Sequence, residues 1–482
     1  MYLFDQKNGT MVGRKEELSI LKSLEQADES SFVAVYGRRR VGKTYLIRHA
    51  FEDKFTFYIT GIGNIGLEAQ LTNFYAGLVR TFPWIEDKKM PDNWFFMFQL
   101  LITALENCDD VQKVLFFDEL PWLDEPKADF IPALEHFWNS WASARRDVIL
   151  IVCGSAASWM VNNLINNRGG LHNRVTHRIR LDPFTLNECE AFLRQKKATY
   201  DRYQIVQLYM ALGGIPFYLK AVNTGKSVAQ NINDLCFSKK GILRLEFDNL
   251  YASLFKNAEK HISIIETLAK KAKGMERTEL LKNAKLTDGG SASKILKELE
   301  ESSFIQKYPA FGKSNRYVLY QLTDFYSLFY LKFIKNTSDL DKDFWLNALD
   351  NPEIRAWTGY AFEQVCLMHL DQIKQALGIS GIQTRSSAWI GESNGQKAQV
   401  DLVIDRRDQV INLCEMKFSI HPFEIDKRYS EELQNKIGVF KTVTKTQKAI
   451  FLTLITTFGL HQNSRGSGLV QNELTMDVLF NT

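Results

Sequence analysis

Residues 37–44 read Gly37-Arg38-Arg39-Arg40-Val41-Gly42-Lys43-Thr44 and match every fixed position of the pattern Gly-x-x-x-x-Gly-Lys-Ser/Thr. The preceding residues 31–36 are mostly apolar and include β-branched valines, as expected of a buried parallel strand. The following residues 45–51 are compatible with a helix. A strand, a glycine-rich loop and a helix in this order turn backbone N–H groups and a helix N-terminus toward an anion. The sequence therefore predicts a phosphate-binding loop.

The last two residues of the loop indicate which phosphate compound it binds. Lys43 has the reach to contact β and γ oxygens, and the Thr44 hydroxyl can bind Mg²⁺, so the expected ligand is ATP with Mg²⁺. A glycine-rich turn without a ligand is the alternative, which the complete pattern in its strand and helix context disfavours. The residues predicted to bind nucleotide here are Gly37, Arg38, Val41, Gly42, Lys43 and Thr44.

A second apolar run, residues 114–119, ends in the carboxylates Asp118 and Glu119. We expect Asp118 to hold Mg²⁺ through water and Glu119 to orient and deprotonate the attacking water, since a carboxylate near the γ-phosphate is the simplest general base. Acidic residues also cap many buried strands, so this run is informative mainly because the loop precedes it. Together the two motifs predict an ATPase.

Composition limits the class of protein. A chain of 482 residues is expected to hold two to four domains, and 45% hydrophobic with 24% charged residues is typical of globular proteins. The net charge of +4 neither demands nor excludes nucleic acid. Six cysteines without a Cys-x-x-Cys pair suit a reducing compartment, and no segment is apolar over the length of a membrane helix. A soluble cytoplasmic protein is expected.

Three further segments extend the pattern. Gly13 and Arg14 stand before the first strand, Ser155 follows the apolar run 148–154, and Pro216 closes Gly213-Gly214-Ile215-Pro216 between two helical patterns. Each has a plainer interpretation: the start of a capped helix, a helix N-cap, and a helix C-cap followed by a breaker.

Over roughly residues 8–250 the ordered set of motifs resembles the archaeal-type ATPases of the AAA+ and STAND class. The resemblance implies that Gly13 and Arg14 line the adenine side, Ser155 lies near the γ-phosphate, and Pro216 contacts nucleotide from a helical lid. It also implies arginines after the strand at 148–154, among which Arg174 is the candidate for a γ-phosphate contact; a solvated loop arginine is the alternative. Such sites often borrow an arginine from a neighbouring subunit, so a homo-oligomer is possible.

Residues 256–335 carry 15 Lys and Arg against 9 Asp and Glu, so the basic surplus of the chain is concentrated there. Helical patterns at 261–271, 277–284 and 291–302 precede two extended segments at 304–308 and 316–320, an order that describes a winged helix. A DNA-reading winged helix would use the side chains Ser291, Ser293, Lys294 and Lys297, with Lys313 and Arg316 on phosphates. Three glutamates on the same helix oppose this, and a spacer or protein contact is the alternative.

The last third carries a second set of charged residues on two apolar strands. Asp401 lies in the first strand, and Glu415 and Lys417 end the second, on one face of it because side chains alternate along a strand. Glu363 opens a helix upstream. The acids can bind Mg²⁺ that polarises a phosphodiester, and the lysine can position or activate water. Acids and lysines on solvated strand faces are the alternative.

This layout resembles the PD-(D/E)XK nuclease superfamily over about residues 355–460, with Val400 where the nominal pattern has proline. Asp401, Glu415 and Lys417 match the motif positions, and Glu363 matches the helix acid. The expected fold is α/β in three parts. Residues 1–250 form an AAA+/STAND-type P-loop ATPase, a parallel sheet with helices on both faces and a helical lid; residues 256–335 form a winged helix; residues 350–482 form a restriction-endonuclease-like domain.

Two functions follow from the sequence. The first is an ATP-binding and ATP-hydrolysing protein that controls a nuclease-like domain acting on DNA. The second is a nucleotide-dependent regulatory switch that binds DNA or protein and cuts nothing. The sequence does not separate them.

Overall fold

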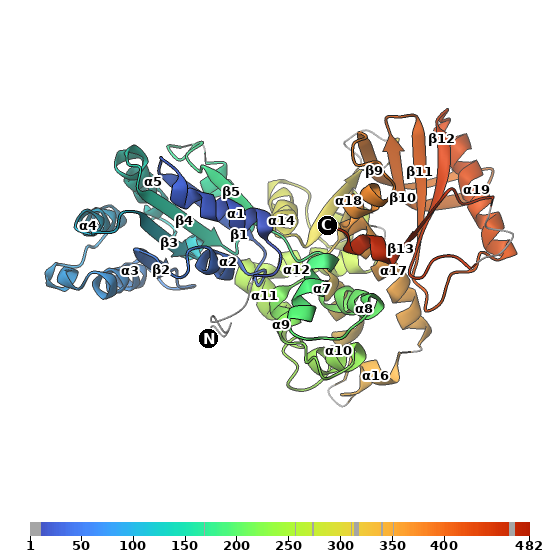
Figure 1. The fold of residues 1–482 in the computed structure, drawn as a ribbon, viewed down its shortest axis with the longest axis horizontal. Coiled ribbons are helices and arrows are strands. Elements are labelled where there is room, and N and C mark those ends of the chain that lie inside the picture. Colours follow the sequence, from blue (N-terminus) through green and yellow to red (C-terminus); the bar gives the residue numbers. More distant parts are fainter. Residues whose placement is uncertain are drawn as a thin grey trace. The chain divides into compact units, whose positions relative to one another are not determined.

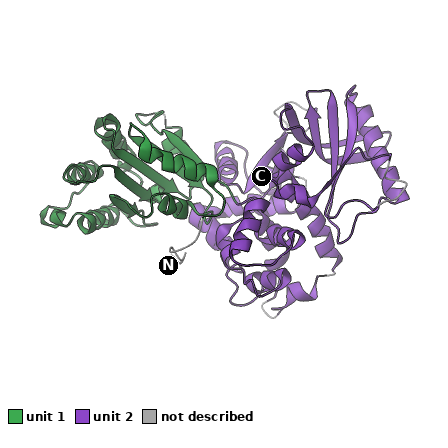
Figure 2. Cartoon of the chain, in the orientation of Figure 1, with its two compact units in different colours: residues 1–183 green, residues 184–482 purple. Residues whose placement is uncertain are grey.

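The chain of the computed structural model divides between Pro183 and Phe184 into two units (Figure 2). The structure describes residues 11–167, 169–255, 257–271, 274–309, 311–312, 318–338, 341–349, 351–461 and 468–482. Unit 1 contains the phosphate-binding loop, and unit 2 contains the two acidic strands near the C-terminal end.

Unit 1 is built on a five-stranded sheet in the order β2-β3-β4-β1-β5, and all its strand pairs are parallel. Helices lie on both faces of this sheet (Figure 1), which explains why its central strands are continuous apolar runs. The strands are β1 Ser31–Gly37, β2 Phe57–Thr60, β3 Lys113–Asp118, β4 Val148–Gly154 and β5 His177–Leu181. The predicted α/β fold with a parallel sheet is confirmed for this unit.

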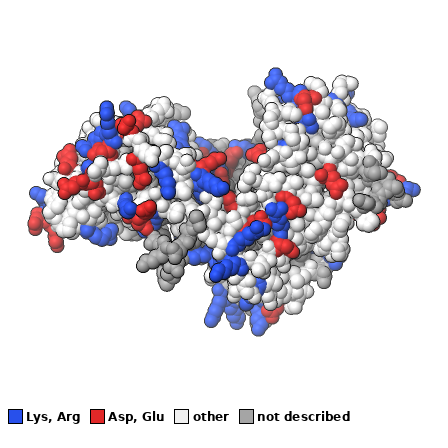
Figure 3. Space-filling model, in the orientation of Figure 1, with Lys and Arg blue, Asp and Glu red and all other residues white. Residues whose placement is uncertain are grey.

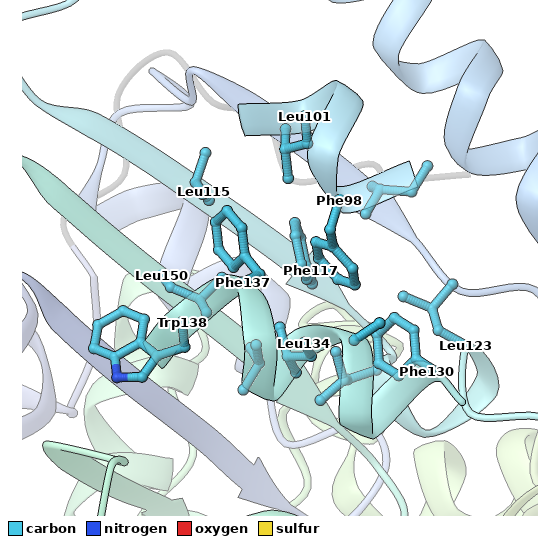
Figure 4. Packing of buried hydrophobic residues seen from close by; sticks show 14 of the residues in the cluster. Phe98, Leu101, Leu115, Phe117, Leu123, Phe130, Leu134, Phe137, Trp138 and Leu150 are labelled. Atoms are coloured by element: carbon cyan, nitrogen blue, oxygen red, sulfur yellow. The ribbon is translucent and has the colours of Figure 1, made fainter. Parts of the chain in front are cut away.

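The helices of unit 1 bury aromatic residues against the sheet. The rings of Phe98 and Phe137 stack at a centroid distance of 5.3 Å, and Phe117 of β3 lies beside Phe98 (Figure 4). The helices are α1 Lys15–Ser23, α2 Lys43–Ala50, α3 Leu67–Thr81, α4 Trp94–Glu106, α5 Phe130–Ser140 and the short α6 Ala157–Trp159. This packing makes the sheet a rigid support for the loops at its carboxyl edge.

Unit 2 begins with helices that the sequence assigned to the ATPase domain. They are α7 Leu186–Gln195, α8 Arg202–Leu212, α9 Pro216–Lys220, α10 Val228–Cys236 and α11 Glu246–Leu254. These helices bury apolar side chains within unit 2, and the predicted domain boundary near residue 250 stays a prediction. Tyr209 of α8 packs on Phe325 at 5.1 Å, and the Tyr326 hydroxyl donates a hydrogen bond to the Leu243 carbonyl at 2.6 Å.

The middle of unit 2 has helices and strands in the order predicted for residues 256–335. A small antiparallel sheet has the strand order β6-β8-β7 and follows the helices in the chain. The elements are α12 Ala258–Ala269, β6 Met275–Glu276, α13 Arg277–Asn283, α14 Gly290–Glu301, β7 Ile305–Pro309 and β8 Val318–Leu322. Three connecting helices follow: α15 Phe325–Phe329, α16 Phe344–Asn347 and α17 Pro352–Met368.

The C-terminal part of unit 2 holds a mixed sheet in the order β13-β12-β11-β10-β9. The pairs β9/β10 and β10/β11 are antiparallel, whereas β11/β12 and β12/β13 are parallel. The elements are α18 Leu370–Ala376, β9 Thr384–Ser393, β10 Gln396–Arg406, β11 Val410–Lys417, α19 Lys427–Thr444, β12 Ala449–Thr456, β13 Asn472–Thr475 and a final 3₁₀ helix Met476–Phe480. Helix α19 covers β9 and β10, and α17 packs against β11.

Candidate functional sites

The phosphate-binding loop follows β1 at the carboxyl edge of the sheet in unit 1. Gly37 has a φ of 141°, and a Cβ there would lie 2.2 Å from the Leu181 carbonyl oxygen, so only glycine fits. Gly42 has a φ of 96° and stands immediately before α2, where the backbone turns into the helix. Val41 between them is buried. The conformation therefore depends on both glycines of the sequence pattern.

Lys43 is buried within the loop. Its ammonium donates hydrogen bonds to the carbonyl oxygens of Gly37 at 3.0 Å and of Arg38 at 2.9 Å. The Arg38 side chain is itself buried. Phosphate oxygens are stronger acceptors for an ammonium group than carbonyl oxygens are, so an anionic ligand can replace these contacts. The backbone carbonyl groups of the loop thus hold the ammonium of Lys43, the lysine that the sequence pattern identified.

Thr44 and Asp118 lie together, although 74 residues separate them in the chain. The Thr44 hydroxyl donates to both carboxylate oxygens of Asp118, at 3.1 and 3.3 Å. Burial raises the pKa of Asp118, while hydrogen bonds from the Cys153 thiol and from Thr44 lower it. Hydroxyl and carboxylate oxygens are the ligands that Mg²⁺ prefers, so this pair is suited to holding that ion. The thiol of Cys153, 2.7 Å from Asp118, is a partner that the sequence analysis missed.

Glu119 adopts a left-handed backbone conformation, with a φ of 49°, directly after β3. Its Oε2 atom accepts hydrogen bonds from the Ser155 amide at 3.1 Å and from the Ser155 hydroxyl at 2.8 Å. Ser155 is buried at the end of β4, the neighbouring strand. The structure thus brings together the predicted general base and the predicted sensor residue.

Gly13 and Arg14 both have positive φ angles, 65° and 57°, at the start of α1. The buried Arg14 guanidinium donates to the carbonyl oxygen of Asp182, and its Nη1 lies 3.7 Å from Glu17 Oε1. Asp182 follows the last residue of β5, Leu181, which is the partner of Gly37. Arg14 therefore lies at the same sheet edge as the phosphate-binding loop.

The structure does not bring Arg174 to the phosphate-binding loop. Arg174 is exposed and precedes the first residue of β5, His177, which pairs with Val33 near the start of β1. Since a strand advances about 3.3 Å per residue, Arg174 lies at the edge of the sheet opposite to the loop. Arg174 therefore does not face the loop of its own chain, because β5 runs parallel to β1, and a γ-phosphate contact from Arg174 stays a prediction. Arg168, another arginine of this segment, lies outside the described residues.

Pro216 belongs to unit 2, where it is the first residue of α9. Gly213, with a φ of 67°, ends α8 as its C-cap, which agrees with the plainer interpretation of this segment. A Cβ on Gly214 would lie 1.9 Å from the Phe184 carbonyl oxygen. A contact between Pro216 and nucleotide stays a prediction.

Asp401, Glu415 and Lys417 form a second group, in unit 2. Leu402 pairs with Cys414 across β10 and β11, so Asp401 and Glu415 follow in register on adjacent strands. The Asp401 carboxylate accepts a hydrogen bond from the Met416 amide at 3.4 Å. Glu415 is buried, whereas Asp401 and Lys417 are half-buried. The pairing of these strands brings Asp401 beside Glu415, and a shared site with Lys417 stays a prediction.

Helix α19 adds two residues to this group that the sequence analysis missed. Lys436 Nζ donates to Glu415 Oε2 at 2.6 Å, and the Tyr429 hydroxyl lies 3.5 Å from the same oxygen. The ammonium of Lys417 lies 4.9 Å from the centroid of the Tyr429 ring. Burial and the neighbouring Asp401 carboxylate raise the pKa of Glu415, and Lys436 opposes that shift. A spacing of seven residues on one helix is the sequence signal that could have identified the pair.

The predicted metal ligands Glu363, Asp401 and Glu415 do not form a ready metal site. Within the described ranges, no three His, Cys, Asp or Glu side chains are arranged to hold a metal ion. Glu363 is half-buried on α17, and Glu415 already has Lys436 as its ionic partner. Sequence spacing cannot reveal this, because the competing lysine comes from a helix that follows the motif.

The predicted DNA-reading face lies on α14. Ser291, Ser293, Lys294 and Lys297 are all exposed, while Lys313 and Arg316 lie outside the described residues. The three glutamates that argued against DNA contact have lysine partners: Glu298 with Lys294 at 3.9 Å, Glu301 with Lys297 at 3.5 Å and Glu300 with Lys307. On the face drawn in Figure 3, basic side chains also gather over the helices α7 to α10.

The parallel sheet with its glycine-rich loop, Lys43 and the Thr44–Asp118 pair define unit 1 as a P-loop nucleotide-binding domain. Residues 11–222 match a family described as an ATPase domain predominantly from Archaea. Residues 11–222 therefore carry an ATPase domain of the type that this family describes, which supports ATPase activity. Among the described residues, no helix has both the length and the apolar composition to cross a membrane.

Individual proteins are similar to larger parts of the chain. An uncharacterised protein of Methanocaldococcus jannaschii is 24% identical over 371 residues, covering 76% of this chain and 78% of that protein. The Walker-type ATPase of Pyrococcus abyssi has a TM-score of 0.49 at 14% identity, over 67% of this chain and 96% of that one. A STAND protein of Pyrococcus horikoshii with a tetratricopeptide repeat sensor has a TM-score of 0.32 at 15% identity, over 78% and 52% of the two chains.

Proposed function

We propose that ATP turnover in unit 1 controls a nuclease-like site in unit 2 that acts on DNA. The single observation that carries this proposal is the register of β10 with β11, which brings Asp401, Glu415 and Lys417 together as the nuclease resemblance requires. The proposal joins two phosphate chemistries in one chain, the first in a nucleotide and the second in a nucleic-acid backbone.

In unit 1 the roles follow from the contacts of each side chain. Lys43 binds the β- and γ-phosphate oxygens, and Thr44 and Asp118 would hold Mg²⁺, which when bound neutralises the charge that develops on the γ-phosphate. Glu119 orients the attacking water and accepts its proton, with Ser155 fixing the carboxylate. Lys43, Asp118 and Ser155 are buried, and burial strengthens the electrostatic contacts that they make.

In unit 2 the residues fit phosphodiester chemistry only in part. Lys417 would orient water or a phosphate, but Glu415 holds Lys436 rather than presenting a free carboxylate. We therefore derive no catalytic step through a metal ion at this site. DNA would reach unit 2 through the exposed Lys294 and Lys297 of α14, which would exchange their contacts with Glu298 and Glu301 for phosphate oxygens.

The alternative function is a nucleotide-dependent switch that binds DNA or protein without cleavage. The ion pair between Lys436 and Glu415 favours it, because the lysine occupies the carboxylate that cleavage would need. The two functions share the ATPase and differ only in what unit 2 does.

Plasmid cleavage separates the two functions. Purified full-length protein is incubated with supercoiled plasmid and Mg²⁺ or Mn²⁺, with and without ATP, beside Lys417→Ala and the matched exposed control Lys441→Ala. Nicking that depends on ATP, is lost in Lys417→Ala and is retained in Lys441→Ala supports the nuclease. Absence of cleavage in every condition sinks it and leaves the switch.

The ATPase roles are tested separately from cleavage. Lys43→Ala is expected to abolish ATP binding, and Glu119→Gln to keep binding while lowering turnover about a hundredfold or more. Turnover of Glu119→Gln equal to that of the wild type would show that another group is the base.

We also propose that the protein self-associates when it binds nucleotide. Arg174 lies far from the loop of its own chain, so a γ-phosphate contact from this residue would have to come from a second copy. Native mass measurement with and without a non-hydrolysable ATP analogue tests this. A monomer under both conditions contradicts it.

A further inference from the structure

Glu415 has very different surroundings at its two carboxylate oxygens. Oε2 accepts a hydrogen bond from Lys436 at 2.6 Å and lies 3.5 Å from the Tyr429 hydroxyl. Oε1 is buried and has no hydrogen-bond partner. Burying a carboxylate oxygen without a donor is costly, and native structures rarely leave one in this state unless another group is meant to meet it. Only one of the two carboxylate oxygens of Glu415 therefore has a hydrogen-bond partner.

The two donors at Oε2 come from one face of α19. Tyr429 and Lys436 are seven residues apart, about two helical turns, so both side chains point toward β11. The Lys436 side chain is 24% exposed and that of Glu415 is 2% exposed, so the ammonium group comes in from the wetter side of the pair. A group in solution thus meets Lys436 before it meets Glu415.

The charge of Lys417 favours the ionised form of Glu415 and so lowers its pKa, but Lys436 is the lysine that makes an ion pair with Glu415. The ammonium of Lys417 lies over the Tyr429 ring, 4.9 Å from the centroid, where it makes a cation–π contact. Lys436 is therefore the cation that the structure pairs with Glu415. Asp401 on the neighbouring strand adds a second negative charge close by. This negative charge favours the binding of any cation at the position that the Lys436 ammonium occupies.

We propose that Lys436 is a built-in competitor of divalent metal at this site, its ammonium neutralising the Glu415 carboxylate to which a metal ion would bind through Oε1. A divalent cation and an ammonium group at contact distance from one carboxylate repel each other strongly. Metal binds only when the Lys436 side chain moves away. The position of this α19 side chain therefore determines whether Asp401 and Glu415 can bind a metal ion. The inference rests on the proposed function in naming the metal site, and it adds the residue that keeps that site closed.

Metal affinity, measured without any cleavage assay, tests the inference. Full-length protein without nucleotide is titrated with Mn²⁺, and free Mn²⁺ is followed by electron paramagnetic resonance. Lys436→Met removes the charge, and Lys436→Gln keeps a donor for Glu415 but no charge, in case the methionine variant does not fold. Both are expected to bind Mn²⁺ at least about tenfold more tightly than the wild type. Circular dichroism checks that each variant is folded.

Two controls isolate the site. Lys441→Met removes an exposed positive charge elsewhere on α19 and is expected to leave the affinity unchanged. Adding Glu415→Gln to the Lys436 variants is expected to remove the gain, since Mn²⁺ held elsewhere, including at Thr44 and Asp118, stays constant. Equal Mn²⁺ binding by the wild type and both Lys436 variants, including no binding in all three, overturns the inference. A gain that survives Glu415→Gln overturns it as well.

Plasmid cleavage by the same proteins tests the nuclease proposal separately from metal affinity. If the Lys436 variants gain Mn²⁺ but cleave no plasmid, the competitor role stands and nuclease activity is excluded under those conditions. If they show the same affinity as the wild type while the wild type cleaves plasmid, the nuclease stands and the competitor role is wrong.

Discussion

Ser155 donates two hydrogen bonds to one oxygen of Glu119, from its amide at 3.1 Å and from its hydroxyl at 2.8 Å. The two residues follow β3 and β4, which are parallel neighbours, so the sheet itself brings their side chains to the same edge. The contact holds the carboxylate that we propose as general base. It leaves the second oxygen of Glu119 for a water molecule.

Removal of the Ser155 hydroxyl is expected to slow ATP hydrolysis. A hydrogen bond to a charged group contributes about 1.5–3 kcal/mol, and part of this is lost in Ser155→Ala because the amide remains. We expect kcat to fall about tenfold while KM for ATP changes little, since Glu119 does not bind the nucleotide in the ground state. Steady-state kinetics beside Ser158→Ala, a buried serine on α6, checks the result. An unchanged kcat in Ser155→Ala would show that Ser155 does not position Glu119 for hydrolysis.

His369 is expected to make unit 2 less stable as the pH falls. Its Nε2 accepts a hydrogen bond from the Leu186 amide at 2.9 Å, and its Nδ1 lies 2.8 Å from the Val365 carbonyl oxygen. Burial lowers the pKa of His369 to about 4. An unfolded histidine has a pKa of about 6.5, so the unfolded chain takes up the proton first as the pH falls. The stability contribution is complete above pH 6.5 and is lost between there and about pH 4, by up to about 3 kcal/mol.

Urea unfolding at pH 7 and pH 5 measures this effect. His369→Gln is expected to unfold with a smaller difference between the two pH values than the wild type. His421→Gln, which changes an exposed histidine, is expected to keep the full difference. A full difference in His369→Gln would show that other groups cause the acid sensitivity.

Tyr203 is expected to couple α8 to the end of β11. Its ring stacks on Phe418 at 5.1 Å with an interplanar angle of 10°, and Phe418 contacts Phe362 at 5.4 Å. Phe418 follows Lys417, and Phe362 precedes Glu363 in the chain. Tyr203→Ala should lower the free energy of unfolding by about 2–3 kcal/mol, and Tyr203→Phe, which keeps the ring, by less than about 1 kcal/mol. Equal losses in both variants would trace the effect to the hydroxyl instead.

Hydrogen exchange provides a second readout for the same variants. In Tyr203→Ala the amides at the end of β11 should exchange faster, since the ring no longer covers them, whereas those of β1 in unit 1 should be unchanged. Faster exchange throughout the chain would indicate global destabilisation rather than coupling.

The exposed lysines of α14 are expected to bind DNA. Lys294→Ala with Lys297→Ala should weaken binding to duplex DNA and reduce the slope of log affinity against log salt by about 2, because each lysine releases about one counterion. Fluorescence anisotropy at several salt concentrations measures both quantities. Lys239→Ala with Lys240→Ala, exposed lysines after α10, is the matched control. An equal loss of DNA affinity in the control pair would indicate that the DNA binds over the basic helices α7 to α10.

The sequence predicted the ATPase chemistry well because its motifs are local. Gly37, Gly42, Lys43 and Thr44 lie within eight residues, and the strand before them is buried on both sides, so backbone geometry and apolar pattern agree. The position of Arg174 could not be predicted in the same way, because it depends on the direction of β5 relative to β1, which no local pattern records. Cys153 was missed since a buried thiol in an apolar strand looks like an ordinary core residue.

By itself the sequence determined the parallel α/β sheet of unit 1, its triphosphate chemistry, and the pairing of an acidic strand with a Glu-x-Lys strand in unit 2. These depend on neighbours in the chain, on side-chain alternation and on hairpin closure. Only the tertiary structure decided which groups those residues meet. It placed Ser155 on Glu119 through parallel strands, and it placed Lys436 on Glu415 through helix packing. A charged side chain from another helix or strand can pair with a site residue or block the site. Such contacts depend on distances in space rather than on separation along the chain.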